Sequence, residues 1–350
     1  MTAKRIGVLT GGGDCPGLNP VLVGIVRQAI ALDYDVTGIL KGWLGLIENA
    51  TMPLTRDKVS GILPRGGTIL RTSRTNPYGD GDNVEPTEQV EKIKANFKAM
   101  GLDALIAVGG DDTLGVAYKL NEYEGLPTIG VPKTIDNDLS GTDRTFGFDT
   151  AINIATDAID RLHTTAESHD RVLVIELMGR HAGWITLYAG LAGGADVILI
   201  PEVKVSTEEV CRIITERHAH GRDFSIVAVS EGADVGGGMV LQDQKRDAFG
   251  HVRLGGIGER LAKEIEARTE FETRFVVLGH LQRGGSPTAY DRYLGLRFGM
   301  MAVKLIEEGK FGTMVSLRGN DFVLIPLKDA VSKTRTVDPK LYEAMKVFFG

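Results

Sequence analysis

Short apolar runs alternate along this chain with longer segments in which apolar residues recur every three or four positions. The runs are rich in valine, isoleucine and leucine, and each is followed by glycine or by a polar loop. Continuous apolar runs of this length are typical of strands buried on both faces of a parallel sheet. We expect such strands at residues 6–9, 104–108, 128–131, 172–177, 197–200, 225–229 and 275–278. With helices between them, the pattern predicts an α/β fold with mainly parallel sheets.

The first predicted strand leads through a glycine-rich loop into a helix. We expect Asn19 to cap this helix and Pro20 to be its first residue, because these residue types favour those positions. The apolar stripe of the helix comprises Val21, Leu22, Ile25, Val26, Ala29 and Ile30. A loop that carries Gly12 and Gly13 before a helix can bind an anion through backbone N–H groups, although such glycines also serve close packing alone.

The length of 350 residues is sufficient for about two domains, which would leave a cleft between them. The pattern changes near residues 148 and 282. We therefore predict one domain from residues 1–148 with about 282–330, and a second from 149–281 with about 331–350. Residues 233–252, which contain three consecutive glycines and a charged stretch, are predicted to form a mobile surface segment.

The composition excludes several classes of protein. Hydrophobic residues make up 43% and charged residues 25% of the chain, and no apolar run approaches the roughly 20 residues that a membrane helix needs. The net charge of −6 disfavours nonspecific binding to nucleic acid. Cys15 and Cys211 are the only cysteines, so neither a disulfide framework nor a zinc site is expected. We expect a cytoplasmic protein with no membrane or nucleic-acid partner.

Polar and charged residues gather directly after the predicted strands. Because the carboxyl ends of parallel strands meet at one edge of a sheet, ligands of α/β proteins bind there. The strands at 104–108 and 128–131 are followed by Gly109-Gly110-Asp111-Asp112-Thr113 and by Lys133-Thr134-Ile135-Asp136-Asn137-Asp138. Later strands are followed by Met178-Gly179-Arg180, Glu231-Gly232 and Gly279-His280-Leu281-Gln282-Arg283. We expect these strand ends to form one site.

The first of these segments has the residue types of a site for phosphate and metal. Carboxylates crowded at strand ends repel one another, so Asp111 is a suitable ligand for a Mg²⁺ ion that carries phosphate. Neighbouring glycines such as Gly110 let backbone N–H groups approach the anion. For either acidic segment taken alone, the alternative is an acidic surface turn.

The second segment has the residue types of phosphoryl transfer. Asp136 can take the proton of an acceptor hydroxyl, while Asp138 and Thr134 orient or hydrogen-bond the acceptor. Lys133 or Arg180 can neutralise the charge of the transition state. The alternative for Asp138 alone is an Asx-turn.

Four cationic residues suit a second phosphate that does not react. They are Arg171, Arg274, His280 and Arg283, and arginine forks match phosphate oxygens well. Such a group implies a phosphorylated substrate, and Glu231 could bind hydroxyls of its sugar. The alternatives are surface charges for the arginines and a core position for His280.

Together these residues resemble the 6-phosphofructokinase family. The matching motifs are Gly12-Gly13-Asp14, Gly109-Gly110-Asp111-Asp112-Thr113, Pro132-Lys133-Thr134-Ile135-Asp136-Asn137-Asp138, Met178-Gly179-Arg180, Glu231-Gly232 and Gly279-His280-Leu281-Gln282-Arg283-Gly284-Gly285-Ser286-Pro287. They follow the family order across roughly residues 5 to 300. The resemblance implies two similar three-layer αβα domains with the active site in the cleft between them.

The resemblance also implies a role for each motif. It makes Asp136 the base toward the 1-hydroxyl of fructose 6-phosphate and Asp111 the Mg²⁺ ligand. The donor would contact Gly12, Gly13, Gly110, Asp112, Thr113 and Lys133. The sugar phosphate would contact Thr134, Asp136, Asp138, Met178, Gly179, Arg180, Glu231, His280 and Arg283. Arg171 and Arg274 would come from a neighbouring subunit, in a homodimer or homotetramer.

Two positions bear on the phosphoryl donor. ATP-using members of the family typically have glycine where this chain has Asp112 and Lys133, and pyrophosphate-dependent members resemble this sequence. A carboxylate and an ammonium there would exclude the nucleotide and admit pyrophosphate. We therefore predict a reversible, pyrophosphate-dependent phosphotransferase. The alternatives are an ATP-dependent 6-phosphofructokinase, more remotely an NAD or lipid kinase, and a non-catalytic sensor of sugar phosphates.

Overall fold

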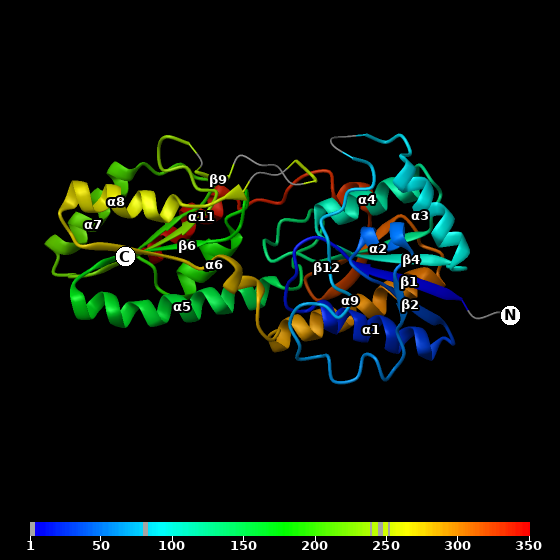
Figure 1. The fold of residues 1–350 in the computed structure, drawn as a ribbon. Coiled ribbons are helices and arrows are strands. Elements are labelled where there is room, and N and C mark those ends of the chain that lie inside the picture. Colours follow the sequence, from blue (N-terminus) through cyan, green and yellow to red (C-terminus); the bar gives the residue numbers. More distant parts are fainter. Residues whose placement is uncertain (1–3, 80–82, 239, 244–247, 251–252) are drawn as a thin grey trace.

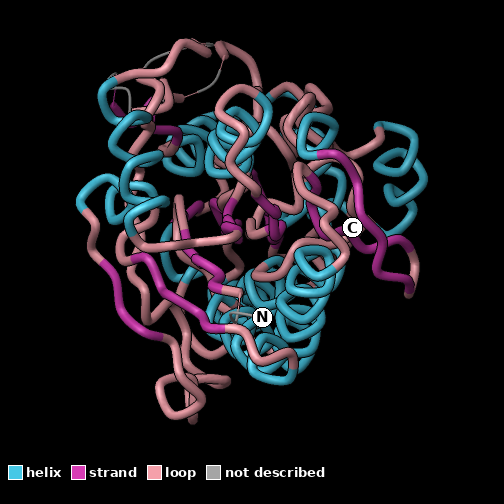
Figure 2. Tube along the Cα trace, turned by 90° about the vertical axis from the view of Figure 1, so that its right-hand side faces the viewer, coloured by secondary structure: helices cyan, strands magenta, loops and turns pink. Residues whose placement is uncertain are grey.

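The computed structural model describes residues 4–79, 83–238, 240–243, 248–250 and 253–350. The molecule has two lobes side by side, each built around one β-sheet (Figure 1). A view turned by 90° shows helices on both sides of the strands (Figure 2). The predicted α/β fold with mainly parallel sheets is confirmed.

The sheet of the first lobe has seven strands in the order β13-β12-β5-β4-β1-β2-β3. The five inner strands are parallel, and only the outer pairs β2–β3 and β12–β13 are antiparallel. The strands are β1 (Arg5–Thr10), β2 (Asp35–Ile39), β3 (Thr51–Pro53), β4 (Ala104–Gly109), β5 (Thr128–Pro132), β12 (Thr313–Arg318) and β13 (Asp321–Pro326). The predicted strands β1, β4 and β5 form the centre, where every residue of β4 and β5 is buried.

The sheet of the second lobe has four parallel strands in the order β11-β6-β8-β7. The strands are β6 (Val172–Leu177), β7 (Val197–Leu199), β8 (Ser225–Ser230) and β11 (Thr273–Val277). All four were expected from their apolar runs, and β6 and β8 are buried throughout. A separate antiparallel pair is formed by β9 (Leu241–Asp243) and β10 (Arg253–Leu254).

Helices cover both faces of each sheet. In the first lobe, α1 and α9 lie on one face and α2, α3 and α4 on the other; in the second lobe α5 lies opposite α7 and α8 (Figure 1). The helices are α1 (Leu18–Ala31), α2 (Trp43–Glu48), α3 (Glu88–Ala99), α4 (Asp111–Glu122), α5 (Phe148–His169), α6 (Trp184–Ala192), α7 (Thr207–Ala219), α8 (Ile257–Thr269), α9 (Ala289–Glu307), α10 (Leu327–Ala330) and α11 (Pro339–Met345), with 3₁₀ turns η1 (Gly279–Arg283) and η2 (Lys346–Phe348).

Helix α1 confirms most of the predicted stripe but begins differently. The residues of the predicted stripe are buried except Ile30, which is 43% exposed. The cap is Gly17 in the left-handed region (φ 112°), not Asn19. Asn19 is instead buried, where its amide donates to the carbonyl of Arg65 (3.0 Å) and its oxygen accepts from the N–H of Ile69 (3.0 Å). A long-range contact therefore outweighs the capping preference.

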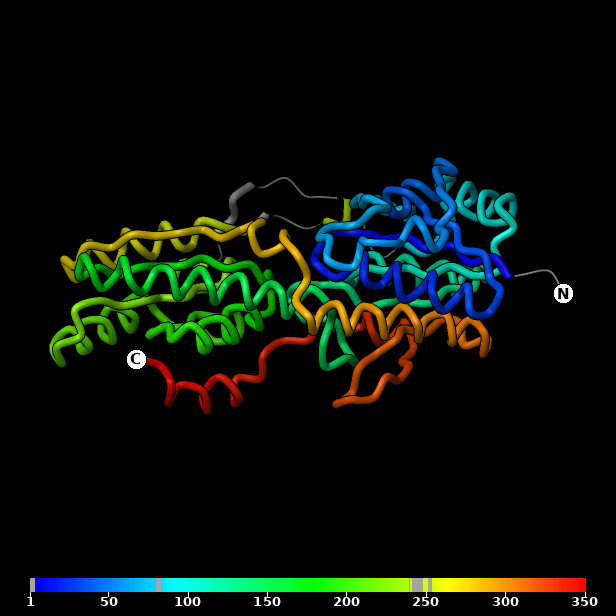
Figure 3. The backbone as a smooth tube through the Cα atoms, turned by 90° about the horizontal axis from the view of Figure 1, so that it is seen from below, coloured from blue at the N-terminus to red at the C-terminus, as the bar shows by residue number. Residues whose placement is uncertain are grey.

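The chain crosses between the lobes after β5, through η1 into α9, and again after α10, where the C-terminal segment returns to the second lobe (Figure 3). The domain ranges expected from the sequence stay a prediction. Of the segment predicted to be mobile, residues 239, 244–247 and 251–252 lie outside the described residues. In the part of the chain that the structure describes, no helix is both long and apolar enough to cross a bilayer.

Candidate active site

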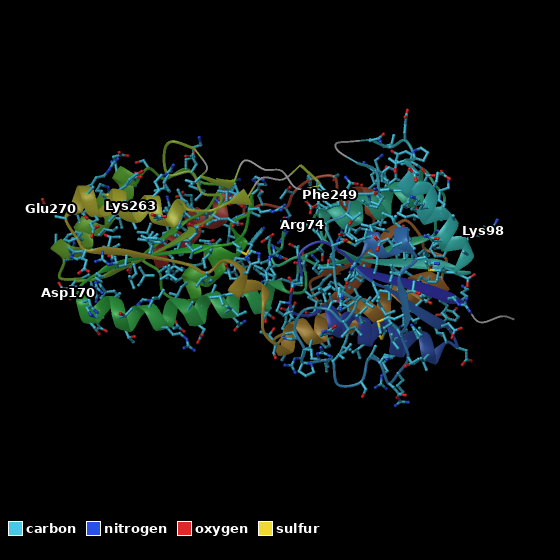
Figure 4. All side chains as sticks on the ribbon, viewed as in Figure 1. Arg74, Lys98, Asp170, Phe249, Lys263 and Glu270 are labelled. Carbon is cyan, nitrogen blue, oxygen red and sulfur yellow. The ribbon has the colours of Figure 1, made fainter. Side chains whose placement is uncertain are left out.

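A cavity lies at the carboxyl ends of β1, β4 and β5, where loops of the second lobe meet the first sheet. Its lining residues are Gly12, Gly13, Arg74, Gly110, Asp111, Asp112, Thr113, Lys133, Thr134, Asp136, Asp138, Arg180 and Arg283. All but Arg74 were proposed from the sequence. Arg74 belongs to a long loop after β3 and lies at the side of the first lobe that faces the second (Figure 4). No strand end or periodic pattern marks this loop, so the sequence offered no signal for Arg74.

The acidic residues of the first motif form the start of helix α4. Gly110 is the extended N-cap residue, and Asp111 and Asp112 occupy the first turn, where negative charge is favourable. Thr113 is buried beneath the neighbouring strand ends, and a Cβ atom on Gly109 would collide with its side chain. The glycine thus lets strand and helix pack closely, while Asp111 remains exposed to a ligand.

Lys133 links strand β5 to the glycine loop after β1. Its side chain is buried, and Nζ donates a hydrogen bond to the carbonyl of Gly13 (2.6 Å). Burial is the main reason that the pKa of this ammonium lies below its usual value. Gly12 adopts a left-handed conformation (φ 76°), which brings the loop over Lys133. Loop and ammonium together form a cationic end of the cavity.

The loop after β5 presents two carboxylates to the same cavity. Asp136 is only 6% exposed, and its Oδ1 has no hydrogen-bond partner among the described residues. The loop turns at Asn137 (φ 52°), whose side chain accepts a hydrogen bond from the N–H of Thr145 (3.0 Å). The pKa of Asp138 rises to about 7, first because of burial and then because of the charges of Asp136 and Asp111. A buried carboxylate oxygen without a partner, as in Asp136, and a strongly raised pKa, as in Asp138, are each typical of functional sites.

The second lobe contributes a strained turn after β6. Gly179 (φ 150°) and Arg180 (φ 48°) direct their N–H groups to one oxygen of Glu231, at 3.3 and 3.2 Å. Burial raises the pKa of Glu231 to about 7. The N–H of Met178 donates to the side chain of Gln282 (2.9 Å), a fully buried residue. Gln282 was not selected from the sequence, where it is one polar residue within the His280–Arg283 motif.

Not every proposed residue lines the cavity. Four residues that follow β6, β8 and β11 of the second lobe are absent from its lining: Met178, Gly179, Glu231 and His280.

Arg171 and Arg274 lie at the opposite, amino ends of β6 and β11, where both pair with Glu272 at 2.6 and 2.7 Å. Asp170, which precedes Arg171, lies at the outer end of the second lobe (Figure 4). One chain therefore does not bring the four expected cationic residues together.

The sequence profile of the phosphofructokinase family matches residues 5–306, which include every strand end at the cavity. The chain belongs to the phosphofructokinase family. The match spans both sheets except β12 and β13. Membership confirms the family that the motifs resemble.

Relatives of this phosphofructokinase are similar over nearly its whole length. A pyrophosphate–fructose 6-phosphate 1-phosphotransferase from Streptomyces coelicolor is 57% identical and matches 99% of this chain and 100% of its own. An ATP-dependent 6-phosphofructokinase from Chloroflexus aurantiacus is 52% identical and matches 96% of this chain and 93% of its own. A pyrophosphate-dependent phosphofructokinase from Nitrosospira multiformis superposes with a TM-score of 0.84 at 19% identity, over 99% of this chain and 92% of its own, and supports the fold alone.

Proposed function

We propose that this phosphofructokinase transfers a phosphoryl group reversibly from pyrophosphate to the 1-hydroxyl of fructose 6-phosphate. The relative from Streptomyces coelicolor is named for this reaction. The observation that carries the choice of donor is the buried Lys133 ammonium at one end of the cavity, with Asp112 in the lining of the same cavity. The family resemblance implies that members that use ATP typically have glycine at both positions. The carboxylate of Asp112 repels the α-phosphate of a nucleotide, whereas the ammonium attracts a short diphosphate.

A comparison of donors tests this proposal directly. Initial rates are measured with pyrophosphate and with ATP at saturating fructose 6-phosphate and Mg²⁺. We expect kcat/KM for pyrophosphate to exceed that for ATP by about 100-fold or more, because a site that repels one donor discriminates strongly. High turnover on ATP with none on pyrophosphate would favour the alternative, the activity for which the relative from Chloroflexus aurantiacus is named.

The residues of the cavity suggest how transfer proceeds. Asp136 is the proposed base, because its unpaired Oδ1 is free to accept the proton of the acceptor hydroxyl. Thr134 and Asp138, on the same loop, orient that hydroxyl. Lys133 from the first lobe and Arg180 from the second line the same cavity and neutralise the charge of the transferred group.

Asp111 is the proposed ligand of Mg²⁺. Its exposed carboxylate offers oxygen, the ligand type that Mg²⁺ prefers. Among the described residues no group of three or more metal-binding side chains occurs. One carboxylate is enough, because Mg²⁺ retains water molecules and binds substrate phosphates. When bound, the ion neutralises charge on the diphosphate.

The sugar phosphate is proposed to bind at the second lobe. Glu231 accepts hydrogen bonds from sugar hydroxyls beside Met178 and Gly179, and His280 and Arg283 hold the 6-phosphate. Nη1 of Arg283 also donates to the carbonyl of Asp14 (3.3 Å), which connects η1 to the glycine loop of the donor lobe. This contact supports a substrate held between the lobes.

Glu231 gives a prediction about pH. Its pKa lies at about 7 in the folded chain, above the ordinary value of 4.5, so its contribution to stability is present at low pH and is lost as pH rises through 7. Glu231→Gln keeps an oxygen for both N–H donors. We expect the substitution to raise the free energy of unfolding by on the order of 3 kcal/mol at pH 8 and to change it little at pH 4.

Denaturant unfolding at both pH values measures this effect, with the exposed Glu308→Gln as control. An equal gain at pH 4 and pH 8 would contradict the argument. The KM for fructose 6-phosphate should rise in Glu231→Gln, because the amide donates where the carboxylate accepts.

Arg171 and Arg274 are proposed to act in the site of a neighbouring subunit. Strand β11, which carries Arg274, is the edge of its sheet and exposes Phe275 and Val277 to 42% and 48%. Apolar edge strands invite pairing with another chain. We propose that a second copy covers this edge, in a homodimer or homotetramer.

Mixing two inactive variants tests the shared site. Arg171→Ala/Arg274→Ala and Asp136→Asn should each be nearly inactive alone. After joint refolding, about half of the dimers are mixed and hold one intact site, so we expect about a quarter of wild-type activity. No recovery, although co-purification of differently tagged chains shows mixed assemblies, would mean that the two arginines do not complete the site of a neighbouring subunit.

The lobes are proposed to divide the substrates. Residues 1–148 with 282–330 would bind pyrophosphate and Mg²⁺, and residues 149–281 with 331–350 would bind the sugar phosphate.

We also infer a cytoplasmic location from Cys15 and Cys211, which are buried as free thiols.

A further inference from the structure

A group of arginine and aromatic side chains lies between the loop of residues 134–138 and helix α6, outside the cavity. The guanidinium of Arg335 lies 4.2 Å from the ring centre of Trp184. The guanidinium of Arg144 lies 4.8 Å from the ring centre of Tyr188. Trp184 and Tyr188 stand one turn apart on α6, with ring centres 6.2 Å apart. Arg144 of the first lobe and Arg335 of the segment that crosses back after α10 thus pack on two rings of the second lobe.

Arg335 also binds the backbone of the loop that carries the proposed base. Its Nη1 donates to the carbonyl of Asn137 (3.0 Å), and its own N–H donates to the carbonyl of Asp138 (2.6 Å). The indole N–H of Trp184 donates in turn to the carbonyl of Arg335 (2.9 Å). Side chain and backbone of Arg335 therefore connect the residues that follow Asp136 to the start of α6.

The segment around Arg335 is held at both ends. Thr334 forms an antiparallel bridge with Leu139, just beyond the loop. The N–H of Val337 donates to Glu202 (2.8 Å), and the same carboxylate accepts from the N–H of Gly183, the cap of α6 (2.9 Å). The segment around Arg335 is therefore bound to the loop of residues 134–138 at one end and to the second lobe at the other.

The charge of Arg335 is compensated only in part, by the carboxylate of Asp143, which points away from a role in stability alone. Burial lowers the pKa of its guanidinium. In the part of the chain that the structure describes, no carboxylate forms an ion pair with it, and its partners are a carbonyl and an aromatic ring. A partly buried cation without a paired carboxylate stabilises a fold weakly at best. A leucine or methionine would avoid that penalty but would leave the carbonyl of Asn137 without this donor.

We propose that Arg335 is a positioning residue that holds the loop of Asp136 and Asp138 in register with α6, and through α6 with Arg180, four residues before that helix. The inference rests on the proposed role of Asp136 as base. In this proposal, the segment after α10 that contains Arg335 aligns reacting groups that come from different lobes. Misplacement by about 1 Å is enough to lower a rate by about 100-fold.

Kinetics of Arg335→Met and Arg335→Lys test the proposal. The assay uses the donor on which the wild type is most active, so a wrong assignment of donor would not affect the comparison. We expect Arg335→Met to lower kcat by about 10- to 100-fold with both KM values within about threefold of wild type. Arg335→Lys should recover part of the loss, because it keeps a donor and the charge. Lys333→Met, at an exposed position of the same segment, should match wild type.

Fluorescence reports the contact independently of activity. The chain has two tryptophans, so Trp43→Phe leaves Trp184 as the sole reporter. Arg335→Met should shift its emission, and Lys333→Met should not. A shifted emission with kcat within about twofold of wild type would overturn the proposal. If Arg335→Met does not fold, Trp184→Phe decides, because it removes the N–H that binds the carbonyl of Arg335, and wild-type kcat in that variant would overturn the proposal.

Discussion

Replacing Asp136 by asparagine is expected to lower kcat by about 10³-fold, within the range that a positioned base contributes. The carboxylate is buried, and one oxygen has no partner among the described residues, so it can accept the proton of the sugar hydroxyl. The amide has the same shape but cannot take a proton. Single-turnover measurements with pyrophosphate and fructose 6-phosphate isolate this step.

Asp143→Asn is the matched control for this variant. Asp143 follows in the same connection between β5 and α5, but it is exposed, and its carboxylate accepts a hydrogen bond from the N–H of Gly319 (2.7 Å). An asparagine can accept the same bond, so kcat should stay within about twofold of wild type. Fructose 6-phosphate should still bind to Asp136→Asn in calorimetry. Unchanged turnover in Asp136→Asn would show that Asp136 is not the base. A wild type that binds fructose 6-phosphate but never turns over would favour the alternative of a non-catalytic sensor of sugar phosphates.

The double variant Asp112→Gly/Lys133→Gly is expected to gain ATP-dependent activity and to lose most activity with pyrophosphate. Removing the carboxylate relieves repulsion of the α-phosphate, and removing the lysine opens the space beneath the glycine loop. A hydrogen bond to a charged group contributes about 1.5–3 kcal/mol, so kcat/KM for pyrophosphate should fall about 10- to 100-fold. We expect a gain of similar size for ATP.

Both single variants are needed to interpret the double variant. Asp112 and Lys133 line one cavity, so their effects on kcat/KM should not be additive. Thermal unfolding of each variant shows whether the loss of the Lys133 contact to Gly13 disturbs the fold. If pyrophosphate activity and the ATP background both stay at wild-type levels, the two side chains do not select the donor. A nucleotide bound in a reactive position beside both wild-type side chains would lead to the same conclusion.

Elements with strong local patterns could be predicted, and elements with mixed patterns could not. Strands such as β4 are buried on both faces, so their sequences are continuously apolar. Strand β2 reads Asp-Val-Thr-Gly-Ile and has no such pattern. The β12–β13 hairpin has a local signal in the sequence, since the turn residues Gly319 and Asn320 separate two segments rich in apolar residues. The predicted strands above do not include it.

The site shows the same division. Twelve of its thirteen lining residues were expected, because parallel strands deliver their carboxyl ends to one edge of each sheet, and these two edges face the same cavity. Arg74 was missed because it comes from a long loop. The prediction that Asn19 caps α1 was wrong, because Asn19 binds a loop some fifty residues away. The preference of asparagine for helix N-caps cannot reveal such a contact.

The amino-acid sequence by itself determined the α/β class and the family, and it supplied the residues that we propose for phosphoryl transfer, because these depend on local periodicity and on short motifs. Only the tertiary structure decided that Arg171 and Arg274 lie away from the cavity of their own chain and that Arg335 connects the loop of Asp136 to Trp184. These are contacts between segments far apart along the chain. They follow from how the lobes pack, and no local pattern of residues encodes them.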